Sequence, residues 1–122
     1  MNKNYTLLYI DDEPINLMLF ENIFKKKYTI ITAPSGFDGL EKLSMHPEIN
    51  IVFSDMKMPS MNGVEFVIQA KIKYPDIVYF ILTGYDITEE ISDVLDKKII
   101  NKYFRKPFNV KEIEKAIFDE TQ

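Results

Sequence analysis

Five short apolar segments alternate along this 122-residue chain with longer segments of helical periodicity. The short segments are YTLLYI (5–10), YTIITA (28–33), INIVFS (49–54), IVYFIL (77–82) and KYFR (102–105). Apolar runs of this kind are typical of strands that are covered on both faces. Strands that alternate with helices form βαβ units, which assemble into a parallel sheet with right-handed crossovers. The pattern therefore predicts an α/β fold, a three-layer (βα)5 doubly wound sandwich, as one domain over residues 1–122.

Apolar residues at helical spacing in the intervening segments predict which helix faces are buried. The five predicted stripes are Ile15, Leu19, Ile23 and Phe24, broadened by Leu17 and Met18; Phe37, Leu40 and Leu43; Val64, Val67, Ile68 and Ile72; Ile87, Ile91, Val94 and Leu95; and Val110, Ile113 and Ile117. Local signals agree with these helices, because Pro14 would open the first and Ser35 would cap the second. Pro47 and Pro75 would end the second and the third.

The composition excludes several kinds of site. The chain has no cysteine and one histidine, His46, so disulfides, thiolate chemistry and a two-histidine metal site within one chain are excluded. The net charge of −4 argues against a general affinity for nucleic acid or anionic lipid. No apolar run approaches the roughly 18 residues that span a membrane, and the apolar stretch near the N-terminus is too short for a signal peptide. We therefore expect a cytoplasmic protein with no direct nucleic-acid or membrane partner.

The carboxyl ends of four of the five predicted strands carry polar functional groups. Asp11, Asp12 and Glu13 follow the first strand, Asp55 the third, Thr83 and Gly84 the fourth, and Lys106 the fifth. Ligands of open parallel sheets bind beyond these strand ends, so we expect the side chains to meet there. Clustered carboxylates repel one another unless a cation lies among them. Mg²⁺ fits such a cluster, because it binds through few carboxylates and keeps several waters.

The same residues would suit a phosphoryl group. A metal ion, the Lys106 ammonium, the Thr83 hydroxyl and an amide near Gly84 together form a site for phosphoryl oxygens. A carboxylate within such a site can itself be the nucleophile and form an acyl phosphate. We therefore predict that Asp55 is a phosphate acceptor.

Four stretches, YIDDEP, VFSDMKMPSMNG, ILTG and YFRKPF, give the chain a resemblance to the receiver domains of two-component response regulators over essentially its whole length. The resemblance implies a flavodoxin-like sheet of strand order 2-1-3-4-5. It implies that Asp11 and Asp12 bind Mg²⁺ and that Asp55 takes a phosphoryl group from a histidine kinase or a histidine phosphotransfer protein. A receiver domain spanning residues 1–122 would act in a two-component system or phosphorelay as a switch, rather than as a turnover enzyme.

The resemblance also implies roles for residues around the acceptor. Thr83 would be the switch hydroxyl, Lys106 the phosphate contact and Tyr103 the switch aromatic residue. The main-chain carbonyl of Lys57 would be a further metal ligand, while the side chains of Lys57 and Tyr85 would modulate hydrolysis of the acyl phosphate. The peptide bond after Lys106 would be cis. The signal would leave through the surface of the fourth helix, the fifth strand and the fifth helix.

Three other functions fit the sequence less well. A phosphatase of the haloacid dehalogenase kind needs a second aspartate two residues after its nucleophile, where this chain has Lys57. A flavodoxin-like cofactor binder needs a Ser/Thr/Gly loop for phosphate after the first strand, where residues 11–13 are all acidic. A binding module that is never phosphorylated is the third alternative, although every group needed for phosphorylation is present.

Overall fold

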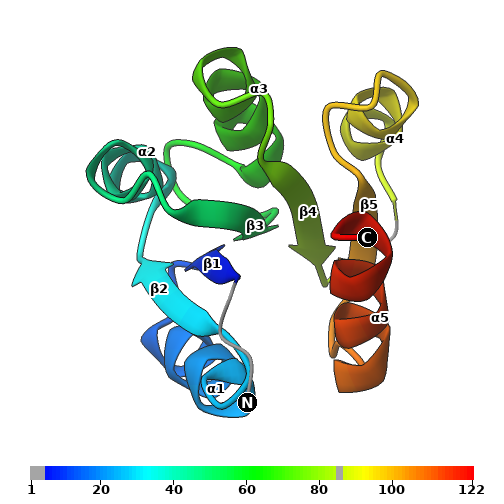
Figure 1. Cartoon of the computed structure of the whole chain (residues 1–122). Helices are drawn as coiled ribbons and strands as arrows, with labels where there is room; N and C mark the ends of the chain where they lie inside the picture. The colour runs from blue at the N-terminus through cyan, green and yellow to red at the C-terminus, as the bar shows by residue number, and fades with distance from the viewer. Residues whose placement is uncertain (1–4, 85–86) are drawn as a thin grey trace.

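Helices cover both faces of a parallel sheet in the computed structural model, which describes residues 5–84 and 87–122. In chain order the elements are β1 (Thr6–Ile10), α1 (Pro14–Phe24), β2 (Thr29–Ala33), α2 (Gly36–Met45), β3 (Ile49–Asp55), α3 (Gly63–Lys73), β4 (Val78–Thr83), α4 (Glu89–Asp96), β5 (Lys102–Arg105) and α5 (Val110–Glu120). The strand order is β2-β1-β3-β4-β5. Helices α1 and α5 cover one face of the sheet, and α2, α3 and α4 cover the other (Figure 1). The predicted three-layer, flavodoxin-like fold is confirmed.

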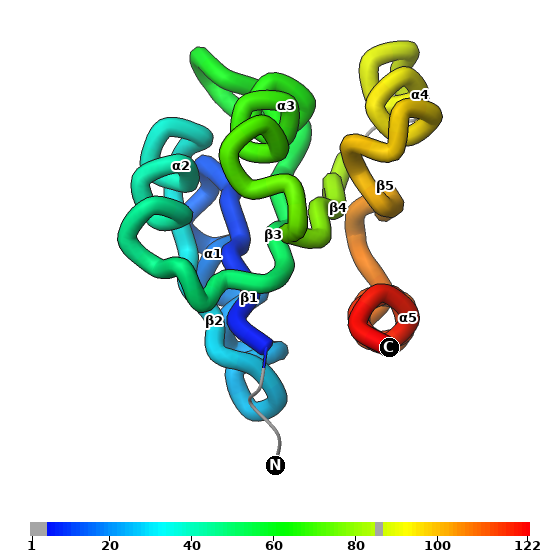
Figure 2. Tube along the Cα trace, turned by 45° about the horizontal axis from the view of Figure 1, so that its top comes forward, coloured from blue at the N-terminus to red at the C-terminus, as the bar shows by residue number. Residues whose placement is uncertain are grey.

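Two apolar cores lie on opposite faces of the sheet. Strand β3 runs through its middle between β1 and β4, with β2 and β5 at the edges (Figure 2). All five residues of β1 are buried, as expected for a central strand between two helical layers. The core beneath α1 and α5 is rich in aromatic rings: Tyr9, Phe20, Phe24, Phe53, Phe80 and Phe104. The core beneath α2, α3 and α4 is mostly aliphatic and includes three methionines: Met56, Met58 and Met61.

Strands β3 and β4 extend one residue beyond their predicted ends. Asp55 pairs with Leu82, and Thr83 pairs with Arg105, so both of these predicted site residues belong to the paired strands. The amide of Met56 continues the β3–β4 pairing by donating to the Leu82 carbonyl at 2.9 Å. Strands β1, β2 and β4 also begin one residue later than predicted. The sheet itself therefore fixes the backbone of Asp55 and Thr83.

The predicted helix boundaries are confirmed. Pro14 is the first residue of α1, and the Ser35 hydroxyl accepts a hydrogen bond from the Asp38 amide at 3.1 Å to cap α2. Helices α2 and α3 each end two residues before a proline. Among residues 5–84 and 87–122, no helix combines the length and the apolar character that crossing a bilayer requires.

The predicted buried face of α1 is largely wrong. Phe20 and Phe24 are the buried residues of α1, whereas four residues of the predicted stripe are exposed: Ile15, Met18, Leu19 and Ile23. Positions 20 and 24 lie one turn apart, and their rings occupy the single stripe of the helix that faces the sheet. The same correction applies elsewhere, because Phe37, Ile68, Ile72, Ile87 and Val110 are also exposed.

Candidate functional site

Three carboxylates meet at the carboxyl edge of the sheet. Asp11, Asp12 and Asp55 each place one carboxylate oxygen so that these oxygens all lie within 4.8 Å of one another. Asp11 is fully buried, Asp55 is 8% exposed, and Asp12 is half-buried. Glu13 is exposed and takes the N-cap position of α1. The acidic cluster therefore consists of the three aspartates that the sequence predicts.

The cluster opens into a cleft of about 270 Å³. The cleft is lined by Asp12, Glu13, Asn16, Asp55, Lys57, Gly84 and Lys106. A Cβ atom added at Gly84 would meet no atom within 4 Å, so the space beside this residue is open to a ligand. The structure thus brings Asp12, Asp55 and Lys106, from the ends of β1, β3 and β5, to one cleft together with Gly84, as the sequence predicts. Thr83, at the end of β4, lines a separate cavity instead.

The Lys106 ammonium bridges two of the carboxylates. Its Nζ lies 2.9 Å from Asp11 Oδ2 and 3.0 Å from Asp55 Oδ1. Burial lowers the pKa of Lys106, but the hydrogen bond with Asp11 and the attraction of Asp55 outweigh burial and leave its pKa above the ordinary value. Lys106 is therefore positively charged at neutral pH. The Lys106–Pro107 peptide bond is cis, as the resemblance implies.

The pKa of the Asp55 carboxyl is raised above its ordinary value. Its burial raises the pKa, and the neighbouring Asp11 raises it further, while Lys106 and the Met56 amide act in the opposite direction without cancelling the rise. A nearby positive charge by itself lowers the pKa of a carboxylate. Here burial outweighs the attraction of the Lys106 ammonium, which also contacts Asp11. The site is thus short of positive charge, which favours the binding of a cation.

Two further residues hold Asp11, and neither was predicted from the sequence. The Tyr9 hydroxyl donates to Asp11 Oδ2 at 2.6 Å, and Asn16 Nδ2 donates to the same oxygen at 3.2 Å. The other oxygen, Oδ1, accepts the Glu13 amide at 3.0 Å. Strand alternation could have indicated Tyr9, because side chains two residues apart in a strand point to the same face.

The backbone of Asp55 lies against the start of α3. The Gly63 amide donates to the Met56 carbonyl at 2.8 Å. A Cβ atom at Gly63 would lie 2.5 Å from the Asp55 carbonyl oxygen, so a side chain at this position would displace the end of β3. Asn62 and Glu65 close a reciprocal capping box at this end of α3. The loop after Asp55 is therefore anchored where it enters the helix.

The predicted switch residues lie on adjoining strands. Thr83 is buried at the end of β4 and lines a cavity of about 490 Å³ between the β3–α3 loop and the start of α4. Tyr103 on β5 is half-buried and packs against the core beneath α2, α3 and α4. Lys57 is exposed beside the cleft. Tyr85 lies outside the described residues. The roles predicted for these residues remain predictions.

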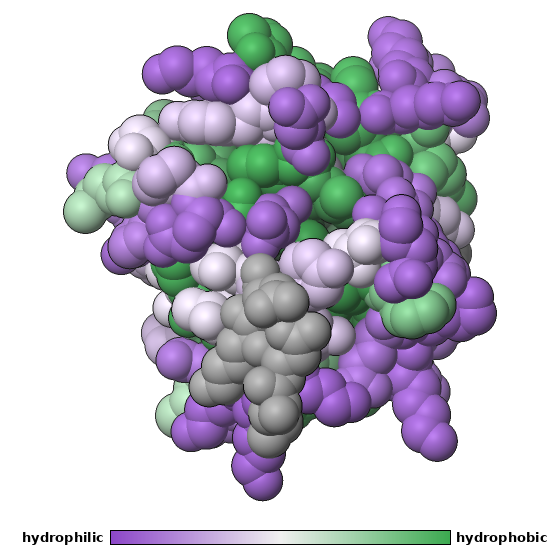
Figure 3. All heavy atoms as spheres, in the orientation of Figure 1, coloured by the Kyte–Doolittle hydropathy of each residue, from purple (hydrophilic) through white to green (hydrophobic). Residues whose placement is uncertain are grey.

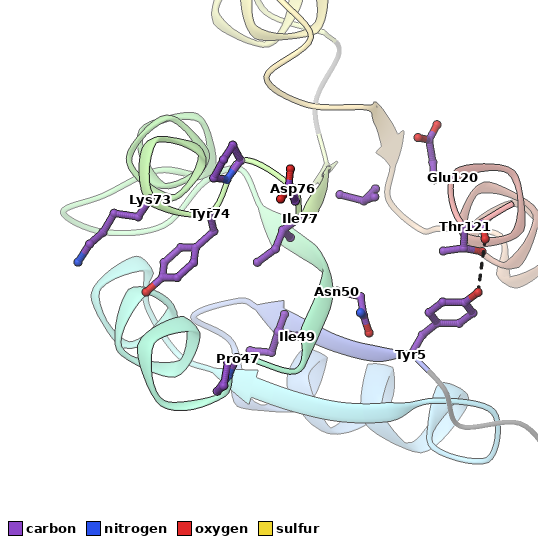
Figure 4. Close-up of a pocket in the computed structure, with 12 residues that line it drawn as sticks. Tyr5, Pro47, Ile49, Asn50, Lys73, Tyr74, Asp76, Ile77, Glu120 and Thr121 are labelled. Carbon is purple, nitrogen blue, oxygen red and sulfur yellow. Dashed lines mark hydrogen bonds between the residues drawn. The ribbon is translucent and has the colours of Figure 1, made fainter.

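A larger cavity, of about 510 Å³, lies at the opposite end of the sheet. Figure 4 shows Tyr5 pointing toward Thr121, whose carbonyl accepts a hydrogen bond from the Tyr5 hydroxyl at 3.4 Å. On the face of the molecule drawn in Figure 3, mainly hydrophilic side chains surround smaller hydrophobic areas.

The acids in the lining of the 510 Å³ cavity are Asp76 and Glu120, and neither belongs to a metal-binding cluster within residues 5–84 and 87–122. We therefore place the functional site at the smaller cleft, where the chemical groups converge.

A comparison with known families agrees with this geometry. The family model described as response regulator receiver domain matches residues 7–118. The chain belongs to this family. Sporulation initiation phosphotransferase F from Bacillus subtilis is 29% identical to this receiver domain over 115 residues, which cover 93% of this chain and 91% of that protein. A response regulator receiver domain protein from Clostridium thermocellum superposes on it with a TM-score of 0.85 at 27% identity, covering 95% of this chain and 93% of that one.

Other relatives are much longer than this receiver domain. The hydrogenase transcriptional regulatory protein HoxA from Cupriavidus necator is 26% identical over 107 residues, which cover 88% of this chain and 22% of HoxA. The receiver domain of this chain thus corresponds to about a fifth of that protein.

The acidic cluster of this receiver domain fits a hard divalent cation. Its donor atoms are carboxylate oxygens, which Mg²⁺ and Ca²⁺ prefer. The cleft also has room for ordered waters, which Mg²⁺ retains when it binds to few carboxylates. Asp11, Asp12 and Asp55 are the residues that could hold the ion.

Proposed function

We propose that this receiver domain, over residues 1–122, is a cytoplasmic phosphoacceptor that takes a phosphoryl group onto Asp55 from a histidine kinase or a histidine phosphotransfer protein. The observation that carries the proposal is the pairing of a buried Asp55 with a Lys106 ammonium inside a cluster of three carboxylates. The name of the Bacillus subtilis relative, a sporulation initiation phosphotransferase, supports phosphoryl transfer as the reaction.

Asp55 would be the nucleophile of the transfer. One carboxylate oxygen attacks the phosphorus of the phosphohistidine and forms a P–O bond as the P–N bond breaks. The electron pair of the broken bond returns to the imidazole nitrogen of the donor. Lys106, 3.0 Å from Asp55 Oδ1, would then stabilise the negative charge of the transferred phosphoryl oxygens.

Mg²⁺ would be held by Asp11, Asp12 and Asp55, with the main-chain carbonyl of Lys57 as a further ligand. When bound, the ion would neutralise charge on the phosphoryl oxygens and relieve the repulsion among the carboxylates. The side chains of Lys57 and Tyr85 would modulate how long the acyl phosphate survives.

An apolar surface beside the cleft would receive the phosphodonor protein. A groove of about 470 Å³ runs between α1 and the start of α5. Its apolar walls include Leu19, Ile23 and Phe108, and its polar residues include Asn16 and Lys106, which also line the cleft. A protein that delivers a phosphohistidine into the cleft has to cover the adjoining surface. The exposed apolar residues of α1 suit that contact.

Phosphorylation would act as a switch through Thr83 and Tyr103. The new anion would attract the Thr83 hydroxyl, because a charge-assisted hydrogen bond is stronger than a neutral one. Movement of Thr83 would open space into which the Tyr103 ring can turn. The surface of α4, β5 and α5 would then change and bind a downstream partner.

The proposal is tested by incubating the protein with acetyl phosphate, with and without Mg²⁺, and measuring its intact mass. We expect addition of one phosphoryl group that requires Mg²⁺ and that is lost in Asp55→Asn. Asp76→Asn is the matched control, because Asp76 is an exposed acid at the opposite end of the sheet. Equal phosphorylation of Asp55→Asn and Asp76→Asn would contradict the proposed acceptor.

A further inference from the structure

The buried Asp11 carboxylate receives hydrogen bonds unevenly at its two oxygens. Tyr9, Asn16 and Lys106 all donate to Oδ2, whereas Oδ1 accepts the Glu13 amide. An ionised carboxylate offers about four lone-pair sites, which are divided between its two oxygens. Oδ2 is therefore saturated, and Oδ1 is the oxygen that keeps capacity for another ligand.

Tyr9 makes the shortest of these bonds, at 2.6 Å, and its ring is firmly held. The side chain is 1% exposed. The ring stacks on Phe20, with centroids 4.2 Å apart and an interplanar angle of 16°. Phe20 in turn contacts Phe53, with ring centroids 5.5 Å apart. The hydroxyl of Tyr9 therefore has one set position relative to Asp11.

We propose that Tyr9 is a positioning residue of the phosphoacceptor site. Its hydroxyl holds the Asp11 carboxylate with Oδ2 directed to Lys106, and leaves Oδ1 for the divalent cation. The same hydrogen bond moderates the attraction between Asp11 and Lys106, so that the ammonium stays shared with Asp55. Donors that orient a ligating carboxylate are important for metal binding, and their loss typically lowers metal affinity by about 10–100-fold.

The inference rests on the proposed Mg²⁺-dependent function, and Tyr9→Phe tests it. This change removes the hydroxyl and keeps the ring. We expect Tyr9→Phe to bind Mg²⁺ about tenfold more weakly than the wild-type protein, measured from amide chemical shifts around the cleft during an Mg²⁺ titration.

Tyr79→Phe is the matched control. Tyr79 is also a fully buried strand tyrosine, and its hydroxyl donates to the Tyr74 carbonyl at 2.9 Å, far from the cleft. Its removal should change the Mg²⁺ affinity by less than about twofold, because distant sites act independently. Unchanged affinity in Tyr9→Phe, tighter binding in Tyr9→Phe, or equal losses in both variants would each overturn the role of Tyr9. A wild-type protein that binds no Mg²⁺ would overturn the proposed function as well.

A second measurement needs no substitution. The ring Cζ resonances of labelled tyrosines report the hydrogen bonds of their hydroxyl groups. Saturation of the wild-type protein with Mg²⁺ should shift the Tyr9 resonance, because the cation withdraws charge from the carboxylate to which Tyr9 donates. The Tyr79 resonance should stay in place. A Tyr9 resonance that does not respond to saturating Mg²⁺ would overturn the inference even if Tyr9→Phe failed to fold.

Discussion

Buried charge dominates the behaviour of individual residues in the cleft. Asp55 and Asp11 are almost inaccessible to solvent, and both contact the same ammonium. A carboxylate in this position is held by the fold against its preference for water. Binding of a cation among the carboxylates would offset this cost, and in the proposed function so would a phosphoryl group on Asp55 that Lys106 contacts. The burial of the Asp55 carboxylate therefore lowers the stability of the metal-free protein.

Asp55→Asn removes the buried charge and should therefore raise the free energy of unfolding by an amount that depends on pH. Burial raises the pKa of Asp55 above its ordinary value of 3.8, so the folded protein binds this proton more tightly than the unfolded chain. The free energy of unfolding therefore falls as pH rises through the interval between the two pKa values. In Asp55→Asn this group does not titrate, so its contribution to the fall in the free energy of unfolding is absent. In urea denaturation without metal, the variant's advantage over the wild-type protein should be largest at neutral pH and shrink as pH drops toward 3.8. An advantage that grows on acidification would contradict the assignment.

The elements follow local signals closely, and the sequence predicts them well. Alternating apolar runs locate every predicted strand to within one residue at each end, and proline and serine signals locate the starts of α1 and α2 and the ends of α2 and α3. The rim residues follow from the same pattern, because parallel strands bring their carboxyl ends to one edge. The buried face of α1 could not be predicted in this way. The exposed isoleucines and leucine of α1 have the spacing of a buried stripe. The stripe that is in fact buried is identified by the contact between the Phe20 and Phe24 rings.

Substitutions in α1 distinguish the two faces. Phe20→Ala removes a ring that contacts Tyr9 and Phe53, and we expect it to lower the free energy of unfolding by about 3–5 kcal/mol. Leu19→Ala, at the next position, removes an exposed side chain and should change it by no more than about 0.5 kcal/mol. Urea denaturation measures both. Similar losses for the two variants would mean that the α1 surface is packed in solution.

The molecule as a whole places its acidic cleft and its proposed output surface on neighbouring strands. Asp55 ends β3, Thr83 ends β4, and Tyr103 lies in β5, so the path from the proposed acceptor to the proposed switch residues crosses adjacent, paired strands. The sequence could not predict which residues from different elements come into contact around the cleft. The contact of Tyr9 with Asp11 and the contact of Gly63 with the Asp55 backbone depend on tertiary geometry rather than on spacing along the chain.

Coupling between the cleft and the output surface should be visible by NMR. The phosphate mimic beryllofluoride, added with Mg²⁺, should shift amides around Asp55 and also those of α4 and β5. Thr83→Ala should still bind the mimic but lose the distant shifts, because the hydroxyl that follows the anion is absent. Distant shifts that persist in Thr83→Ala would show that the signal takes another route. Shifts confined to the cleft of the wild-type protein would show that binding is not coupled to this surface.

Identification of the phosphorylated residue tests the central claim most directly. Borohydride reduces an acyl phosphate to an alcohol, which converts a phosphorylated aspartate into homoserine. The protein is treated with acetyl phosphate and Mg²⁺, reduced with borohydride, digested and sequenced by mass spectrometry. We expect homoserine at position 55, in the peptide that contains VFSDMKMPSMNG. Homoserine at Asp11, Asp12 or any other acid, with aspartate intact at position 55, would contradict the account.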